Sequence, residues 1–300
     1  MVGEIFVNPW RYQLHLEVWL LIAFLVGSYI YVVRVLGPRA VPAGEPIVTR
    51  RQFVCFITGI LIMFFSTDWP MHDIAEEYLY SVHMFQHMSL TYFMPPLVVL
   101  ATPEWFVRVL VGNGRAYRVL QFFTFPVRAG LLFNLGVVIS HIPGVVNASV
   151  SNGPLHYFVH VLLVLTSILM WMPVCGPLKE LQMAPMPKMI YLFLNSVVAT
   201  IPAGWLTFAE GVVYKHYNIP TRVWGVSVSN DQQIAGAIMK LGGSIFLWTI
   251  IVAMFFRHFV KTFRDENKND YDKVESILTT ADVARAFEAS PPAEEPTSHN

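Results

Sequence analysis

The stretch that decides the fold is residues 156–174, HYFVHVLLVLTSILMWMPV, which contains no Asp, Glu, Lys or Arg. As a helix, it has the length needed to cross an apolar layer of about 30 Å. Six further apolar runs flank it, at about 14–35, 52–66, 79–100, 129–146, 188–209 and 233–257. Because backbone polar groups in lipid must be paired within their own segment, all seven runs are predicted to be helices.

The composition excludes the common soluble classes of protein. Hydrophobic residues make up 55% of the 300 residues and charged residues 13%, whereas a typical soluble chain carries about 45–50% and about 25%. The formal net charge is zero, which argues against a nucleic-acid partner, and two cysteines are too few for a disulfide framework. We therefore predict an all-α, polytopic membrane protein with seven transmembrane helices in contact with lipid.

The distribution of basic residues predicts the orientation of these helices. Lysine and arginine gather after the first, third, fifth and seventh runs, whereas the opposite side has only Arg11, Lys215 and Arg222. Because basic loops stay in the cytoplasm, the N-terminus is expected outside and the C-terminus in the cytoplasm. Residues 1–264 then form the membrane domain. Residues 265–300 are polar and acidic, and they are expected to form a largely disordered tail.

Histidines gather at the predicted outer ends of the helices. Two pairs are spaced four residues apart, so each pair shares one helix face: His83 with His87, and His156 with His160. His141 is expected at a matching depth on the run between the pairs. Histidines bonded to interfacial water are one interpretation. However, imidazole in lipid needs a partner and is the commonest metal ligand, so we favour a metal or haem site formed by these five residues.

The choice of metal follows from the side chains around the histidines. Imidazole suits zinc, copper and iron, whereas a thioether favours copper(I). Met84 and Met88 lie one residue after His83 and His87, so copper is the favoured ion, with zinc or haem as alternatives. The acidic residues before this helix, among them Glu76, are interpreted as a solvated loop or as a mouth that attracts cations.

Polar residues of the last run are predicted near the same end of the bundle. Asp231 is expected either to cap its own helix or to orient a ligating histidine through a hydrogen bond, together with Gln232 and Gln233. Lys240 lies in the same predicted helix, about 13 Å deeper than Asp231. A charge inside the membrane is a candidate functional residue, so Lys240 is expected to pair with a carbonyl or carboxylate. Its role is unexplained.

Three functions fit this set of residues. The first is a non-enzymatic protein that binds copper in the outer histidine layer and passes it to a partner in the membrane. The second is an intramembrane zinc hydrolase, which needs three metal ligands, a bound water and a base. The third is an electron carrier with a single b-type haem, because the inner half of the bundle has no histidine for a second haem.

Three separated motifs resemble those of one known family. They are Ser81-Val-His83-Met-Phe-Gln-His87-Met, Pro154-Leu-His156 with His160, and Asn230-Asp231-Gln232-Gln233. Together they are similar to the CtaG family, the polytopic cytochrome c oxidase assembly factors, over roughly residues 50–257. The charged side chain at Lys240 departs from the family pattern, in which an aromatic residue is expected at this position.

The resemblance implies a non-catalytic assembly factor in the bacterial cell (inner) membrane. Such a protein is expected to help install copper in the catalytic subunit of a haem–copper oxidase. Its partners would be that subunit and other copper-delivery proteins. The motif positions carried over to this chain are His83, His87, His156, His160, Asp231 and Gln232.

Overall fold

A computed structural model describes residues 8–219, 222–277 and 280–290. Within these residues every regular element is a helix, so the all-α prediction is confirmed. The chain divides into two compact units, Met1–Ile251 and Val252–Asn300. All of the predicted site residues belong to the first unit.

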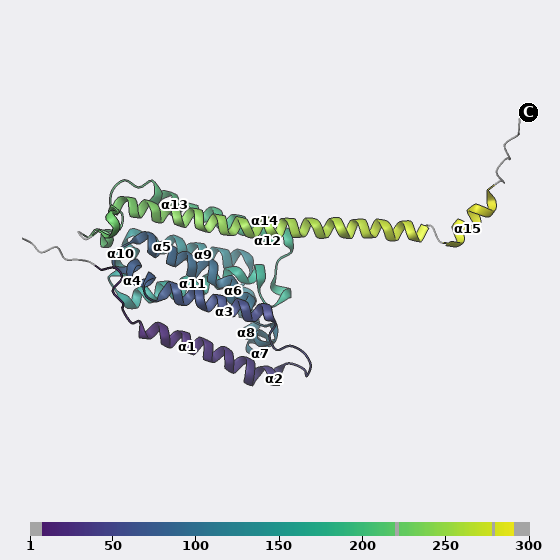
Figure 1. The fold of residues 1–300 in the computed structure, drawn as a ribbon, viewed down its shortest axis with the longest axis horizontal. Helices are drawn as coiled ribbons and strands as arrows, with labels where there is room; N and C mark the ends of the chain where they lie inside the picture. The colour runs from purple at the N-terminus through teal and green to yellow at the C-terminus, as the bar shows by residue number, and fades with distance from the viewer. Residues whose placement is uncertain (1–7, 220–221, 278–279, 291–300) are drawn as a thin grey trace, which may run out of the picture. The chain divides into compact units, whose positions relative to one another are not determined.

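Each of the seven predicted apolar runs contains a long helix (Figure 1). In chain order, the first helices are α1 (Leu16–Tyr31) with its continuation α2 (Gly37–Ala40), then α3 (Arg50–Thr67), then α5 (Tyr80–Met88) with its continuation α6 (Met94–Ala101). They are followed by α9 (Pro126–Ser140), by α11 (Gly153–Cys175), by α12 (Pro185–Val198) with the adjoining α13 (Thr200–Thr207), and by α14 (Val228–Ile277). Both continuations pass through a π-helical turn, Val32–Leu36 in the first and Ser89–Phe93 in the second.

The described residues include five helices that are long and apolar enough to cross a membrane, or up to seven if each of two bent pairs is one span. In the first pair, the helix from α5 to α6 meets α7 (Glu104–Val111) at 86°. In the second, α8 (Arg115–Phe123) meets α9 at 63°. α7 and α8 expose apolar residues beside arginines. This pattern is typical of helices that lie in the membrane surface, so we interpret α7 and α8 as interfacial connections.

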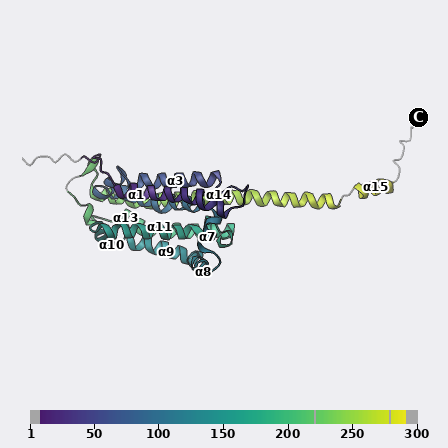
Figure 2. The ribbon, with the colours of Figure 1, turned by 90° about the horizontal axis from the view of Figure 1, so that it is seen from below.

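α11 lies against two other long helices. It packs along α9 and α6, and α3 also packs along α6. Figures 1 and 2 show the long helices side by side, with α1 at the edge of the first unit. Phe133, Leu163 and Trp171 are almost completely buried between these helices. In α1, by contrast, only 6% of the apolar window is buried, which leaves most of its surface available to lipid.

Short helices and turns lie around the histidine-bearing ends of the long helices. They are α4 (Met71–Glu77), α10 (Pro143–Val150) and the 3-10 turns Lys215–Tyr217 and Val223–Gly225. Hydrogen bonds tie them together: the Tyr217 hydroxyl donates to the carbonyl of Ala75 at 3.1 Å, and the Tyr214 hydroxyl donates to the carbonyl of His141 at 3.0 Å. The loop before α14 therefore holds α4 and the end of α9 in place.

The predicted run 129–146 is wrong at its C-terminal end. α9 ends at Ser140, and α10 begins as a separate helix at Pro143. The ring of Pro143 disfavours helical geometry in the residue before it, and Ile142 is accordingly extended, with φ −64° and ψ 129°. The break places His141 just after α9 rather than inside a continuous helix.

Part of the predicted tail is helical. α14 continues to Ile277 and α15 spans Thr280–Ala289, whereas residues 278–279 and 291–300 lie outside the described residues. Many residues of this stretch, such as Glu, Lys, Ala and Arg, are good helix formers. The boundary between a membrane domain and a tail at residue 264 stays a prediction.

Candidate metal centre

The N-terminus of α5 is held by a residue from the last long helix. The carboxylate of Asp231 accepts hydrogen bonds from the backbone N–H groups of Tyr80 and Ser81, at 2.8 and 3.0 Å. It also accepts one from the Ser81 hydroxyl at 2.6 Å. The first N–H groups of a helix have no partner within the helix, so this carboxylate satisfies two of them. It thereby fixes the start of the helix that carries the first histidine pair.

The sequence before α11 places the second histidine pair in the first turns of that helix. The side chain of Asn152 accepts a hydrogen bond from the backbone N–H of Leu155 at 3.1 Å. Pro154 stands in the first turn, where its missing N–H costs no hydrogen bond. The helix therefore begins at Gly153, three residues before His156, and His160 follows His156 by one turn.

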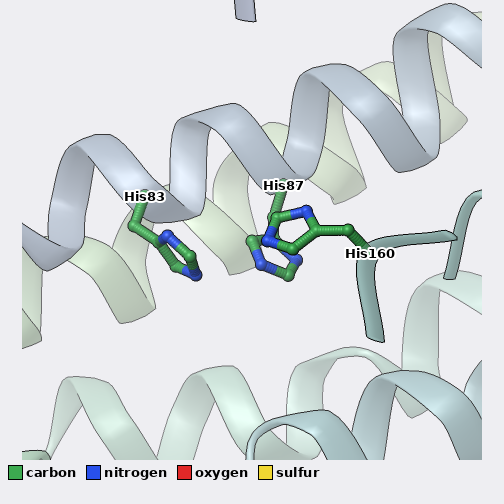
Figure 3. Close-up of side chains that lie close together, drawn as sticks. All are labelled: His83, His87 and His160. Carbon is green, nitrogen blue, oxygen red and sulfur yellow. The ribbon is translucent and has the colours of Figure 1, made fainter. Parts of the chain in front are cut away.

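The two histidine pairs form one cluster. The ring centroids of His83 and His87 are 4.5 Å apart, as are those of His87 and His160. The rings of His156 and His160 are 4.4 Å apart. Figure 3 shows His83 and His87 extending from one helix toward the ring of His160, which comes from another segment. Helices far apart in the chain thus bring four imidazoles together.

Three of these imidazoles converge closely enough to hold one metal ion. One ring nitrogen each of His83, His87 and His160 lies within 4.8 Å of the other two. The rings line a cavity of about 20 Å³, which is room for a single ion or water molecule. Nε2 of His160 is buried and has no hydrogen-bond partner among the described residues. Because such an orphaned atom is unfavourable, its position fits a missing ligand.

His83 is oriented so that one of its nitrogens is free for a metal. Its Nδ1 lies 3.0 Å from Oε1 of Glu76. A carboxylate can only accept hydrogen bonds, so Nδ1 carries the proton and a neutral ring presents its lone pair at Nε2. A carboxylate behind a histidine fixes the ring and raises its basicity at metal sites. The donor set at His83 therefore fits a metal ligand.

His141 and Met84 present a second pair of donors to the same cavity. Nδ1 of His141 lies 2.7 Å from the carbonyl oxygen of Val137, to which it must donate. In a neutral ring the lone pair is then on Nε2, which lies 3.4 Å from the sulfur of Met84. Both residues line the 20 Å³ cavity. The ring centroids of His141 and His87 are 6.0 Å apart, so His141 lies at the edge of the cluster.

Glu76 contacts both histidine pairs. Its Oε1 lies 3.2 Å from Nε2 of His156 as well as 3.0 Å from Nδ1 of His83. Burial tends to raise the pKa of Glu76, but the two neighbouring imidazoles outweigh this effect and hold the pKa well below its usual range. Glu76 is therefore an ionised carboxylate inside a group of imidazoles. The cluster offers oxygen as well as nitrogen and sulfur ligands.

The sequence analysis did not single out Glu76 as a ligand. It precedes His83 by seven residues, but α4 ends at Glu77 and α5 begins at Tyr80. Because the chain changes direction between these helices, helical spacing does not relate the two side chains. The usable signal was weaker: an acidic residue lies close in sequence to a pair of histidines.

The polar residues at the start of α14 lie away from the histidine rings. Asp231 lies in the first turn of α14, but its carboxylate caps α5 rather than its own helix and forms no hydrogen bond to a histidine among the described residues. Its own helix is capped by Ser227, whose hydroxyl oxygen accepts a hydrogen bond from the N–H of Asn230 at 3.2 Å. Gln232 bonds to the backbone of Val213 and Tyr214, at 2.9 and 3.3 Å, and Gln233 donates to the carbonyl of Ala209 at 3.3 Å. These side chains shape the loop over the cluster.

Met88 and Lys240 are also outside the cluster. Met88 is buried, and its methyl group faces Gly242 and Gly243 of α14, so it serves helix packing. Lys240 is exposed. Within the part of the chain that the structure describes, its ammonium group has no hydrogen bond or ion pair, so the expected partner is absent. The orientation of α14 carries Lys240 to the outer surface of the bundle.

A family model described as cytochrome c oxidase caa3 assembly factor (Caa3_CtaG) matches residues 14–261. The chain belongs to this family. The resemblance inferred from the three sequence motifs is therefore confirmed, and the function of the family is cytochrome c oxidase assembly. The matched range includes the whole histidine cluster together with Glu76, Asp231 and Lys240. No curated relative and no solved structure matches the chain.

Proposed function

We propose that this protein binds copper(I) at His83, His87 and His160 and delivers it to the catalytic subunit of a haem–copper cytochrome c oxidase. The observation that supports this most is the convergence of three imidazole nitrogens on one small cavity, in a member of an oxidase assembly family. Imidazole with a thioether beside it suits copper(I). Copper is the cargo, and the protein acts as a carrier rather than as an enzyme.

The proposed topology has seven spans in the bacterial cell (inner) membrane, with the N-terminus outside and the C-terminus in the cytoplasm. It counts one span in each bent pair of helices, with α7 and α8 at the membrane surface. The excess of basic residues in alternate loops supports the orientation. The histidine cluster then lies near the outer surface. Copper reaches it from the outer compartment, where other copper-delivery proteins act as donors.

Delivery requires that the bound ion can be reached by ligands of the partner. His83 is buried, whereas His87 and His160 are partly exposed. An incoming ligand can therefore replace the imidazoles one at a time, beginning with the two that are partly accessible. An oxidase subunit docked sideways in the membrane would present such ligands.

The first experiment measures copper(I) uptake by the purified full-length protein in detergent. The wild type is expected to bind copper, and a double variant, His83→Ala with His87→Ala, is expected to lose it. The variant His258→Ala is the control, because it removes a histidine that does not belong to the cluster. A wild-type protein that takes up no copper, or a double variant that takes up as much as the wild type, would contradict the proposal.

The second experiment asks whether the cluster is needed in cells. Deletion of the gene is expected to remove oxidase activity and the oxidase absorption bands from membranes, and added copper is expected to restore part of the activity. The wild type and His258→Ala should complement the deletion, and the double variant should not. Full complementation by the double variant would show that assembly does not depend on the cluster.

Two alternative functions have specific observations in their favour. A zinc hydrolase is supported by Glu76, which places a base beside the imidazoles, where a metal-bound water would need one. A haem b carrier is supported by an apolar cavity of about 440 Å³ that borders His156 and His160. Zinc in the purified protein with hydrolysis of a lipid ester or amide would favour the hydrolase. A Soret band would favour the haem carrier.

A further inference from the structure

A second group of ligands lies beside the three imidazoles. Ligand atoms of Glu76, His156 and His160 lie within 4.8 Å of one another. These residues come from α4 and α11. The three imidazoles of His83, His87 and His160, by contrast, come from α5 and α11. Ser149 Oγ lies 3.3 Å from Nδ1 of His156, on the opposite side of the ring from the nitrogen that faces Glu76. Each group by itself has three donors.

The two groups cannot hold two ions in the same way at the same time, because both contain His160. A neutral imidazole has one nitrogen with a free lone pair and therefore binds one metal ion. Two separate sites would need six ligand residues, and only five are present in the two groups. The arrangement is that of two neighbouring positions for a single ion.

The two positions differ in donor chemistry and in charge. The position formed by Glu76, His156 and His160, called the first position from here on, includes a carboxylate, which is a hard ligand and holds copper(I) weakly. The second has three imidazoles with the sulfur of Met84 nearby, which suits copper(I) better. Each position has one buried and two partly exposed residues. The position that binds copper(I) more weakly carries the negative charge of Glu76, and this charge attracts a cation.

We propose that one copper(I) ion occupies these positions in turn. It is received by Glu76, His156 and His160, and it then moves to His83, His87 and His160. His160 stays bound throughout. The bonds from copper to Glu76 and His156 break, and bonds to His83 and His87 form. The ion keeps its oxidation state. Nε2 of His156, which donates to Glu76, gives up its proton when it binds copper, and Nδ1 of the same ring gains one and donates it to Ser149 Oγ; the change reverses when the ion leaves, so no net proton is released. This inference rests on the proposed function, since it assumes that copper is the cargo.

The contact between Glu76 and His83 gives the exchange a direction. While Oε1 of Glu76 binds copper, it is not available to His83. When the ion moves on, the carboxylate returns to Nδ1 of His83, as the 3.0 Å contact between these two side chains indicates. That hydrogen bond orients His83 and strengthens its Nε2 as a ligand. Departure of the ion from the first position therefore stabilises the second.

The test compares the rate and the equilibrium of copper(I) binding in the full-length protein, with copper(I) supplied as its bicinchoninate complex. Glu76→Gln keeps the shape of the side chain and an oxygen that accepts the hydrogen bond from His83. It is expected to slow uptake by at least about tenfold and to lower the equilibrium affinity by much less than His87→Ala does, because the amide oxygen still orients His83. His87→Ala is expected to lower the equilibrium affinity by at least about tenfold.

Glu77→Gln is the matched control. Glu77 is the next residue of α4, is exposed and bonds to Gln13 instead of the histidines. Its loss changes the net charge equally, so it should leave the rate of uptake as in the wild type. His156→Asn is a second variant of the first position. It should show the same slow uptake as Glu76→Gln and keeps the inference testable if Glu76→Gln does not fold.

The possible outcomes separate this inference from the proposed function. Wild-type uptake in Glu76→Gln and His156→Asn would overturn the two-position inference while copper binding stands. Equal slowing by Glu76→Gln and Glu77→Gln would also overturn it, because a general charge effect would then suffice. A loss of equilibrium affinity in Glu76→Gln as large as that in His87→Ala would mean that Glu76 only orients His83. That result would also overturn the two-position inference. A wild-type protein that binds no copper would overturn the proposed function itself.

Discussion

The carboxylate of Asp231 lies 2.8 Å from the backbone nitrogen of Tyr80, although 151 residues separate the two in the chain. The contact joins the beginning of α14 to the beginning of α5. Asp231 is completely buried, so its hydrogen bonds to α5 are shielded from water. The negative charge also lies at the positive end of the helix dipole. The geometry of the helix that carries His83 and His87 therefore depends on the last long helix.

Replacement of Asp231 by alanine is expected to destabilise the protein. The first N–H groups of α5 would be left buried without an acceptor, and loss of such a cap costs about 2 kcal/mol in the free energy of unfolding. Thermal unfolding of the purified protein measures the effect. Asp231→Asn, which keeps one acceptor oxygen, should lose less. An unfolding temperature of Asp231→Ala equal to that of the wild type would contradict the capping role.

The sulfur of Met84 is expected to contribute to the choice of metal. Met84→Leu keeps an apolar side chain of similar volume but removes the thioether beside His141. It should weaken copper(I) binding and leave zinc binding unchanged, because soft sulfur favours copper(I). Competition titrations with each metal measure both affinities. Met88→Leu is the control, because Met88 faces α14. Equal effects of Met84→Leu on both metals would argue against a role for the sulfur.

Gly236 is expected to be essential for the packing of α14 against α13. A Cβ atom at this position would lie 2.6 Å from Oγ1 and 2.7 Å from the backbone nitrogen of Thr207. Gly236→Ala would therefore push the helices apart, at a cost of about 1–3 kcal/mol in stability. In Gly242→Ala the nearest atom to the new Cβ is 3.7 Å away, so that variant should be as stable as the wild type. The unfolding temperatures of Gly236→Ala and Gly242→Ala, each compared with that of the wild type, test this expectation.

Lys240 is expected to be independent of the metal centre. Its side chain is exposed and contacts none of the histidines, so Lys240→Leu should leave copper(I) affinity unchanged. The stability of the protein should not fall, because leucine replaces a charged side chain that is unfavourable on a membrane-spanning helix. Copper titration and thermal unfolding of the same sample test both statements. A fall in copper affinity would place Lys240 in the function of the cluster.

The sequence predicted the helices well because their signal is local. Each apolar run is long, and its length follows directly from the thickness of the membrane. The error after Ser140 also has a local cause, since Pro143 interrupts a run that is apolar throughout. Helix ends at a proline can be anticipated, and greater weight on Pro143 would have separated α9 from α10.

The histidine cluster was predictable because spacing by four places two rings on one side of a helix. That argument does not extend to Glu76 or to the partner of Asp231. Both depend on how separate helices meet, which is decided by tertiary packing. The same limit explains Met88: its position next to His87 suggested a shared ligand set, but neighbouring residues on a helix point in different directions.

The contact between Asp231 and α5 has a consequence for the stage of synthesis at which the helix carrying His83 and His87 is held in place. A chain emerging from a ribosome contains His83 and His87 long before it contains Asp231. Until α14 has been synthesised and has inserted beside α5, the first turn of α5 lacks its acceptor. The final position of the helix that carries His83 and His87 is therefore tied to synthesis of α14, and a chain truncated before Asp231 would carry the histidines without the residue that caps their helix.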